Sequence, residues 1–344
     1  MKNILDLKIE KLNNWTVVND GSGNEFSSPI LSNNNEGVND IYRTCNFLKA
    51  NKQKVSGLDG GHIHFDAAFM KDRNAYINLL ELYFSTEKLL YIISNEKGTK
   101  PREETVLDCG YAKPLSKMFF DRCQEMNEEE IETLKYLNDK EFINKIKVLQ
   151  ETRNFGINFS NVDDGSKMDI NTIEFRMPNG TINPDVWIEN INLFGGIIKV
   201  ANELSIIQSK DILSKEEERK IQIFNKIKDS NTSEKEKLEY LLILAIPEEN
   251  REIYINRYIV NKELLKQDEE RNYELNKAAE LKYGKLPELQ KQLKIEEEKA
   301  EKEKSADDNL LRNKVTEDEI AKIISRWTGI PVAKLIEGER LCNF

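Results

Sequence analysis

The stretch TIEFRMPNG, residues 172–180, decides the fold class of this 344-residue chain. Polar and apolar side chains alternate through its first six residues, which predicts a strand with one polar face and one face turned into a core. The PNG tripeptide is typical of a turn and ends the strand. Glu174 and Arg176 share the polar face, where a carboxylate could hold a cation and a guanidinium could stabilise a phosphoryl group. The alternative is an exposed salt bridge worth about 0–1 kcal/mol.

A second strand is predicted at GGHIHFD, residues 60–66, which contains both histidines of the chain. His62 and His64 share one face with Asp66, and two apolar side chains share the other. Neutral imidazole binds divalent metals and donates to phosphate oxygens, and the two leading glycines allow close approach of a ligand to the backbone. The alternative is an exposed strand with incidental histidines. If both strands belong to one sheet, their polar faces together suit a divalent ion and a nucleotide.

Helical segments are predicted on either side of these strands. Apolar residues recur at helical spacing over residues 37–49, 74–94 and 185–207, which predicts three amphipathic or buried helices. Strands separated by helices, with polar side chains on one strand face, predict an antiparallel or mixed sheet that is covered on one side only. We therefore expect an α+β domain over residues 1–208, followed by a helical part of the same region over residues 209–265.

Composition and charge narrow the range of partners. The net charge is −10 and the pI is about 5.2, so the chain repels phosphate backbones and we expect no nucleic-acid partner. The longest apolar stretch, residues 240–246, is far shorter than the ~20 residues that span a membrane, so we expect no membrane insertion. The N-terminus has no apolar segment of the kind found in signal peptides, which predicts a cytoplasmic protein.

The motifs of the first two thirds of the chain resemble one enzyme family. They are DGS…EFSSPIL (residues 20–31), GGHIHF (60–65), TIEFRMPNGTI (172–182) with Trp187 after it, and RYIVN (257–261). In order and spacing they are similar to the motifs of the amidoligases, which are relatives of glutamine synthetase and of glutamate–cysteine ligase. The resemblance covers about residues 20–261 and implies a sheet of the glutamine-synthetase-like type packed with helices.

This resemblance implies an ATP-dependent carboxylate–amine ligase. ATP would phosphorylate a small-molecule or peptide carboxylate, and an amine would displace phosphate from the acyl phosphate to give an amide. The family's metal is Mg²⁺ or Mn²⁺, and by position its ligands would be Glu25, His62 and Glu174. His64 and Arg176 would contact the nucleotide, with Arg176 and Glu174 as the catalytic pair. The substrate side would comprise Asp20, Ser22, Arg153 and Asn158, although a structural role is an equal alternative for Arg153 and Asn158.

One feature of the family is not found in this sequence. The family begins with a strand that carries a Glu-x-Glu pair and supplies ligands to both metals, whereas residues 1–19 contain no such strand. Residues 8–10 (KIE) are expected to be helical and carry a single acid. The resemblance therefore implies an impaired metal site, an upstream start, or acids from another element. The alternative function is a non-catalytic, degenerate ligase fold that binds a peptide or a chaperone.

The end of the chain has a different pattern, rich in Glu, Lys, Leu and Gln. Residues 266–304 are predicted to form a charged helical hairpin or coiled coil, because Gly284 would end one helix and Pro287 would begin the next. A narrow apolar seam, formed by leucines 286, 289 and 293, would join the two helices. Residues 305–344 are predicted to form a short helical segment.

This tail resembles the ring-forming disaggregase chaperones of the ClpB type. Residues 275–293 are similar to the end of their coiled-coil middle domain, and residues 315–340, with SRWTGIPVAKLIEGER, to the linker into their second ATPase domain. No phosphate-binding GxxxxGK[ST] motif occurs in the sequence, so we expect no motor activity. The tail is either a fusion relic or a segment that docks on chaperone rings or self-associates.

Overall fold

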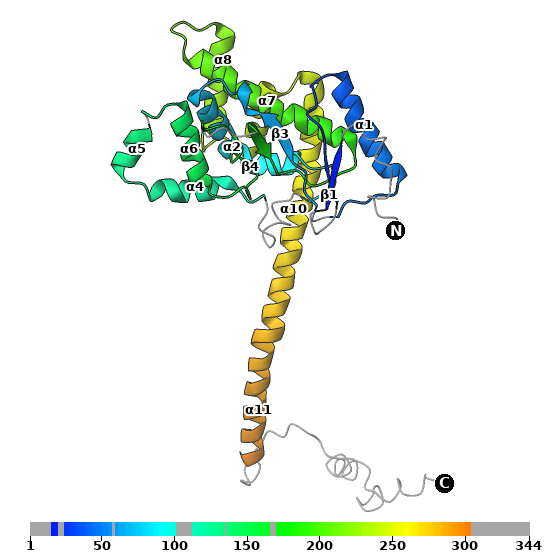
Figure 1. The fold of residues 1–344 in the computed structure, drawn as a ribbon. Coiled ribbons are helices and arrows are strands. Elements are labelled where there is room, and N and C mark those ends of the chain that lie inside the picture. The colour runs from blue at the N-terminus through cyan, green and yellow to red at the C-terminus, as the bar shows by residue number, and fades with distance from the viewer. Residues whose placement is uncertain are drawn as a thin grey trace, which may run out of the picture. The chain divides into compact units, whose positions relative to one another are not determined.

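The fold is known from a computed structural model, which describes residues 15–19, 24–56, 59–100, 112–134, 136–165 and 170–303. The chain divides into two compact units, residues 1–268 and residues 269–344. In the first unit, helices surround a small antiparallel sheet (Figure 1). The predicted α+β class is therefore confirmed.

The two predicted strands are neighbours in one sheet. β3 (Ile63–Asp66) and β4 (Ile157–Asn158) each pair antiparallel with β5 (Thr172–Phe175), which gives the order β3-β5-β4. The register places His64 opposite Glu174 on one side and Asn158 opposite Glu174 on the other. Residues at the same register position point to the same face of a sheet, so this row of three side chains crosses the polar face.

The apolar face of the sheet packs on two long helices, α2 (Arg73–Ile93) and α7 (Pro184–Gln208). The Phe175 ring stacks on Phe194 of α7 with centroids 4.3 Å apart, and Phe65 meets Phe175 edge to face at 5.9 Å. Aromatic pairs in these geometries contribute about 0.5–1.5 kcal/mol beyond their buried area. Helices cover the apolar face of the sheet, as predicted. The prediction that only one face is covered is wrong, because Asn158, Glu174 and Arg176 on the polar face are buried too.

Shorter elements complete the first unit. A separate two-stranded sheet is formed by β1 (Thr16–Asn19) and β2 (Asn24–Ser27). The remaining elements are α1 (Asn35–Ala50), η3 (Ala67–Phe69), α4 (Leu115–Gln124), α5 (Glu128–Leu134), α6 (Asp139–Gln150), α8 (Lys215–Lys228), α9 (Glu234–Ala245) and η4 (Glu248–Asn250). The three helices predicted from periodicity correspond to α1, α2 and α7. None of the helices in the described ranges is long and apolar enough to cross a membrane.

Side chains of α10 (Arg251–Ala279) donate hydrogen bonds to backbone carbonyls in the last turn of α2. Arg257 binds the Glu189 carboxylate and donates to the Ile93 carbonyl at 3.3 Å. Asn261 donates to the Ile92 carbonyl at 3.0 Å. Desolvation lowers the pKa of Arg257 to about 10, although nearby carboxylates oppose the shift. These side chains satisfy carbonyls that a helix end leaves without partners, so the RYIVN motif has a structural role here.

The predicted hairpin turn at Gly284 is wrong. The backbone stays helical from α10 through a π-helical segment, η5 (Glu280–Lys285), into α11 (Leu286–Glu303). Leu286 has helical dihedral angles, φ −62° and ψ −46°. In a regular α-helix the Pro287 ring would clash with the carbonyl four residues earlier. A π-helical turn moves that carbonyl away from the position it has in a regular α-helix, which explains why proline does not end the helix.

Gly284→Ala is therefore expected to increase the helix content and the stability of this segment. Glycine is less favourable than alanine in a helix interior by roughly 1 kcal/mol, and a Cβ at Gly284 would meet no atom within 4 Å. Circular dichroism during thermal unfolding measures the effect. Gly196→Ala is the matched control: Gly196 also lies in a helix, but its Cβ would come within 2.2 Å of the Ala245 carbonyl, so the protein should lose stability. A loss of helix in Gly284→Ala would indicate that Gly284 ends a helix after all.

Candidate functional site

The centre of the polar face is the carboxylate of Glu174, which is only 3% exposed. Its Oε2 accepts a hydrogen bond from Asn158 Nδ2 at 2.7 Å, and its Oε1 accepts one from Arg176 Nη1 at 2.6 Å. Arg176 is also buried. The side chains of Glu174, in β5, and Arg176, directly after β5, lie on the same face because residues two apart in an extended strand point the same way. Glu174 and Arg176 were predicted to form either an exposed salt bridge or a ligand site, and they form a buried ion pair.

Both histidines point toward the same carboxylate oxygen. His62 Nδ1 lies 3.3 Å and His64 Nε2 lies 3.6 Å from Glu174 Oε1. The other ring nitrogen of His64, Nδ1, is 3.1 Å from the Thr172 hydroxyl. The side chains of His62 and His64 are 28% and 43% exposed, whereas the Glu174 side chain that they approach is 4% exposed. Nitrogen atoms of three side chains therefore converge on one anionic oxygen.

The environment of Glu174 holds it in the ionised form. Burial is the largest influence on its pKa and raises it. The hydrogen bond from Asn158 and the charges of Arg176, His62 and His64 act in the opposite direction and prevail, so the pKa of Glu174 lies below its ordinary value. This balance is the expected one for a buried carboxylate that keeps its charge, since burial alone would neutralise it.

The sequence did not reveal how Asn158 is held. Its Oδ1 accepts hydrogen bonds from Gln150 Nε2 at 3.2 Å and from the Ser160 backbone N–H at 2.9 Å. Gln150 is the last residue of α6 and is 1% exposed. A buried glutamine needs hydrogen-bond partners, but the sequence alone does not show that Gln150 is buried.

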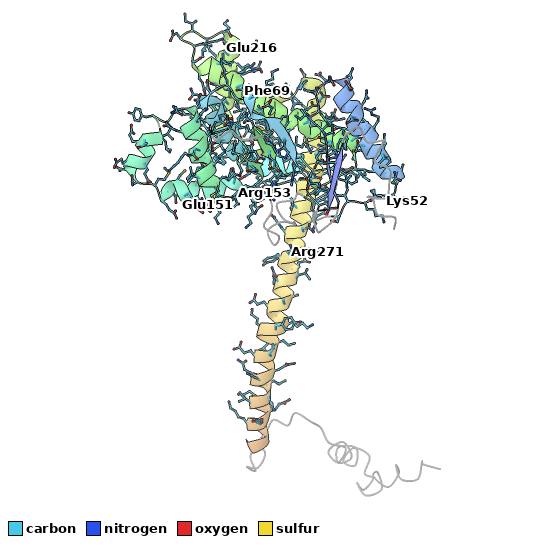
Figure 2. The ribbon with its side chains drawn as sticks, in the orientation of Figure 1. Lys52, Phe69, Glu151, Arg153, Glu216 and Arg271 are labelled. Carbon is cyan, nitrogen blue, oxygen red and sulfur yellow. The ribbon has the colours of Figure 1, made fainter. Side chains whose placement is uncertain are left out.

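Other predicted site residues lie elsewhere or outside the described ranges. Glu25 is exposed on β2, opposite Val18 in the two-stranded sheet. Arg153 is exposed in the loop after α6, close to Glu151 (Figure 2). Asp20 and Ser22 lie outside the described residues. The described structure therefore brings together five of the predicted residues and leaves the roles of the others as predictions. The five are His62, His64, Asn158, Glu174 and Arg176.

The glycine before His62 makes room for a tryptophan ring. A Cβ on Gly61 would lie 2.5 Å from Cη2 of Trp187 and 3.1 Å from the Asn179 carbonyl oxygen. Such contacts are too close for any other residue, so the packing of α7 against the start of β3 requires glycine here. The structure thus gives Gly61 a packing role, and the predicted approach of a ligand to its backbone stays a prediction.

The turn after β5 is also structural. The backbone N–H of Asn179 donates a hydrogen bond to Asn95 Oδ1 at 2.7 Å. Thr181 and Asn183 donate to the Glu96 carboxylate at 3.2 and 2.8 Å. Asn95 and Glu96 follow the C-terminus of α2, and Asn183 is the N-cap of α7. The PNGT motif therefore fixes the turn to both helices that support the sheet.

A resident magnesium site does not fit the residues as arranged. Within the described ranges, no three His, Cys, Asp or Glu side chains are placed to hold a metal ion. Glu174 supplies the one carboxylate of the cluster, and its Oε1 is already bound to Arg176. Mg²⁺ prefers several oxygen ligands in octahedral geometry, and protein sites for it often complete the shell with substrate phosphates and water.

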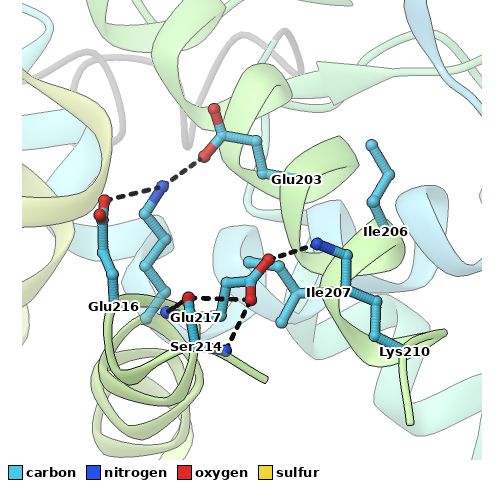
Figure 3. Close-up of a pocket in the computed structure, with 8 residues that line it drawn as sticks. Glu203, Ile206, Ile207, Lys210, Ser214, Glu216 and Glu217 are labelled. Carbon is cyan, nitrogen blue, oxygen red and sulfur yellow. Dashed lines mark hydrogen bonds and ion pairs between the residues drawn. The ribbon is translucent and has the colours of Figure 1, made fainter. Parts of the chain in front are cut away.

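Two clefts in the described part of the chain are lined by residues outside this cluster. One, of about 310 Å³, lies between the end of α7 and the start of α8 (Figure 3). Its lysines are paired: Lys220 binds Glu203 at 3.0 Å, and Lys210 binds Glu217. Another, of about 190 Å³, is lined by residues of α7 and α10. Because the lysines of the larger cleft already bind carboxylates, that cleft offers little to an anionic ligand.

Comparison with known proteins separates the tail from the rest. A segment of the chain is 61% identical over 71 residues to "Chaperone protein ClpB" of Clostridium perfringens, which is 21% of this chain and 8% of the chaperone. It is 58% identical over 74 residues to the ClpB of Bacillus cereus, again 8% of that protein. With "Chaperone protein ClpB2, chloroplastic" of Oryza sativa, it is 48% identical over 107 residues, or 31% of this chain and 10% of the chaperone. The chain thus spans about a tenth or less of these relatives, and the predicted resemblance is confirmed.

The larger part of the chain matches a different family. No solved structure matches the chain. A family profile described as "Putative amidoligase enzyme" matches residues 6–198, which is more than half of the chain and includes the whole β3-β5-β4 sheet. The match ends before residue 257 and does not cover the RYIVN motif. The chain therefore belongs to the amidoligase family.

Proposed function

We propose that this protein joins a carboxylate to an amine at the expense of ATP, and that ATP binds on the polar face of the β3-β5-β4 sheet. One observation carries the proposal: Arg176, His62 and His64 converge on the buried, ionised carboxylate of Glu174. Cationic and imidazole donors beside a carboxylate suit a phosphate chain that carries a metal ion. Mg²⁺ enters as part of the substrate MgATP.

The reaction requires two transfers. The substrate carboxylate attacks the γ-phosphorus of ATP, ADP leaves, and an acyl phosphate forms. The amine then attacks the acyl carbon, phosphate leaves with the electrons of the broken C–O bond, and the nitrogen loses a proton to give the amide. The protein's part in such chemistry is mainly positioning and charge stabilisation.

The cluster can serve these steps by an exchange of partners. In the structure, Arg176 is bound to Glu174 at 2.6 Å. A bound phosphate chain would give Arg176 a second anion, and the magnesium of the substrate MgATP would give Glu174 a second cation. Entering phosphate oxygens would compete with Glu174 for ring nitrogens of His62 and His64, whose side chains are 28% and 43% exposed. The exchange keeps each buried charge compensated, which a buried site requires.

A second candidate, a non-catalytic interaction protein, rests on the tail. Leu286, Leu289 and Leu293 are each at least half exposed, and they follow the 3–4 spacing of a coiled-coil seam. An isolated helix with exposed leucines is marginal in water and gains stability by pairing with another helix. We propose that α11 pairs in this way, with a chaperone ring or with a second copy of the chain. This role and the ligase activity are compatible in one protein.

Calorimetric titration of AMP-PNP, a non-hydrolysable ATP analogue, tests the ligase proposal. We expect binding that requires Mg²⁺ and that weakens at least tenfold, or roughly 1.4 kcal/mol, in both His62→Ala and His64→Ala. Lys199→Ala is the control, because this lysine is 77% exposed on α7 and away from the cluster. Absence of binding in the folded wild-type protein would overturn the ligase proposal and favour the interaction protein. Binding that both histidine variants retain in full would place the nucleotide elsewhere.

A further inference from the structure

The side chain of Gln150 makes three hydrogen bonds, all to β4 and the residue after it. It donates to the Ile157 carbonyl at 3.1 Å and to Asn158 Oδ1 at 3.2 Å, and it accepts from the Phe159 backbone N–H at 2.9 Å. Gln150, Ile157, Asn158 and Phe159 are all 1% exposed or less. Water cannot replace these bonds at such burial, so the glutamine amide has one satisfied orientation.

This orientation determines which end of the Asn158 amide faces Glu174. Asn158 Oδ1 accepts from both Gln150 and the Ser160 backbone N–H at 2.9 Å, so the oxygen is committed to that side. The amide nitrogen must then point the other way, where it donates to Glu174 Oε2 at 2.7 Å. An asparagine amide presents a donor at one end and an acceptor at the other, and the second would repel a carboxylate.

We infer that Gln150 is a positioning residue of the nucleotide site: through Asn158 it fixes the Glu174 carboxylate in the place where Arg176 and the two histidines meet it. The inference rests on the proposed function and extends it to a residue of α6, outside the sheet. The chain of contacts runs Gln150 to Asn158 to Glu174, and each link is a buried hydrogen bond. Its members come from α6, β4 and β5, so the site depends on how α6 ends.

Gln150→Glu is the sharpest test, because it keeps the shape of the side chain and removes the amide NH₂ that donates two hydrogen bonds. The new carboxyl group, protonated at this burial, has a single O–H for two acceptors, the Ile157 carbonyl and Asn158 Oδ1. When that O–H donates to the Ile157 carbonyl, Asn158 turns its amide nitrogen toward the other carboxyl oxygen, which directs Oδ1 at Glu174. We expect at least a tenfold weaker binding of magnesium–AMP-PNP by calorimetry. We also expect the ionisation of Glu174, followed by carboxyl ¹³C NMR without ligand, to occur at higher pH than in the wild-type protein.

Gln208→Glu is the matched control. Gln208 and Asn78 form a reciprocal amide pair, with nitrogen–oxygen distances of 3.1 and 3.2 Å, between α7 and α2. This variant breaks another glutamine–asparagine contact, in which Gln208 is exposed and Asn78 is buried, and we expect it to leave both readouts unchanged. If Gln150→Glu only lowers stability and leaves the Glu174 titration where it was, the inference is overturned. If the wild-type protein binds no nucleotide, the proposed function fails, but the NMR titration still decides whether Gln150 positions Glu174.

Discussion

Glu174→Ala is expected to abolish nucleotide binding and to lower the free energy of unfolding by about 3–5 kcal/mol at pH 7, the usual cost of removing one partner from a buried ion pair. The side chains of Glu174 and Arg176 are 4% and 8% exposed. The substitution removes the carboxylate that compensates the buried guanidinium, and it also removes the acceptor of the Asn158 hydrogen bond. Urea denaturation measures the loss. Glu81→Ala is the control, since Glu81 pairs with Lys228 at 2.8 Å but is 38% exposed, and it should cost less than about 1 kcal/mol.

The same substitution has a characteristic pH dependence. The pKa of Glu174 is lower in the folded protein than its ordinary value of 4.5, so the unfolded chain takes up a proton first as the pH falls. The stability contributed by the ionised carboxylate is therefore fully present above pH 4.5 and is lost as the pH falls through the folded pKa. The difference in stability between wild type and Glu174→Ala should shrink below pH 4.5. A difference that stays constant to low pH would contradict the buried ion pair.

Arg257→Met should be the second most damaging substitution, with a loss of about 3–5 kcal/mol. Methionine keeps much of the apolar stem, so the loss reports mainly on the guanidinium. That buried group binds the partly exposed Glu189 carboxylate and the Ile93 carbonyl, and its removal leaves the carboxylate and a helix end without their partner. Thermal and urea unfolding of the purified variant measure the effect.

The control for this prediction is another arginine in an ion pair. Arg43 binds Asp40 at 3.0 Å, but its side chain is 58% exposed. Arg43→Met should therefore cost no more than about 1 kcal/mol. Equal losses of stability in the two variants would mean that the hydrogen bonds between α10 and α2 contribute little to folding stability. The RYIVN motif would then not have the structural role given to it here.

The sheet and its polar face could be predicted because strand alternation is a local signal. The period of two in residues 172–177 and 62–66 assigned Glu174 and His64 to polar faces, and the observed register places them opposite each other. It did not predict that Glu174 and Arg176 would be buried. Burial depends on what covers a face, and the elements concerned are distant in the sequence.

Local sequence patterns could not predict the contacts made by the structural motifs or by Gln150. Asn179 and Asn261 belong to motifs of the amidoligase resemblance, yet each binds near the end of α2, 80 or more residues away. Gln150 is the last residue of an ordinary amphipathic helix. It binds β4, a strand of only two residues, which is too short to show an alternating pattern in the sequence. The Gly284 signal failed for another reason: glycine permits a left-handed helix end but does not require it.

Photolabelling with the γ-(4-azidoanilide) of ATP and Mg²⁺, followed by peptide mapping, tests the central claim most directly, because its reactive group is attached to the γ-phosphate and locates that end of the nucleotide on the chain. The account predicts labelled peptides from residues 60–66 or 172–177, with labelling that excess ATP suppresses and that His64→Ala reduces. Labelling confined to residues 203–220, which line the cleft between α7 and α8, would contradict it, as would labelling that ATP does not suppress.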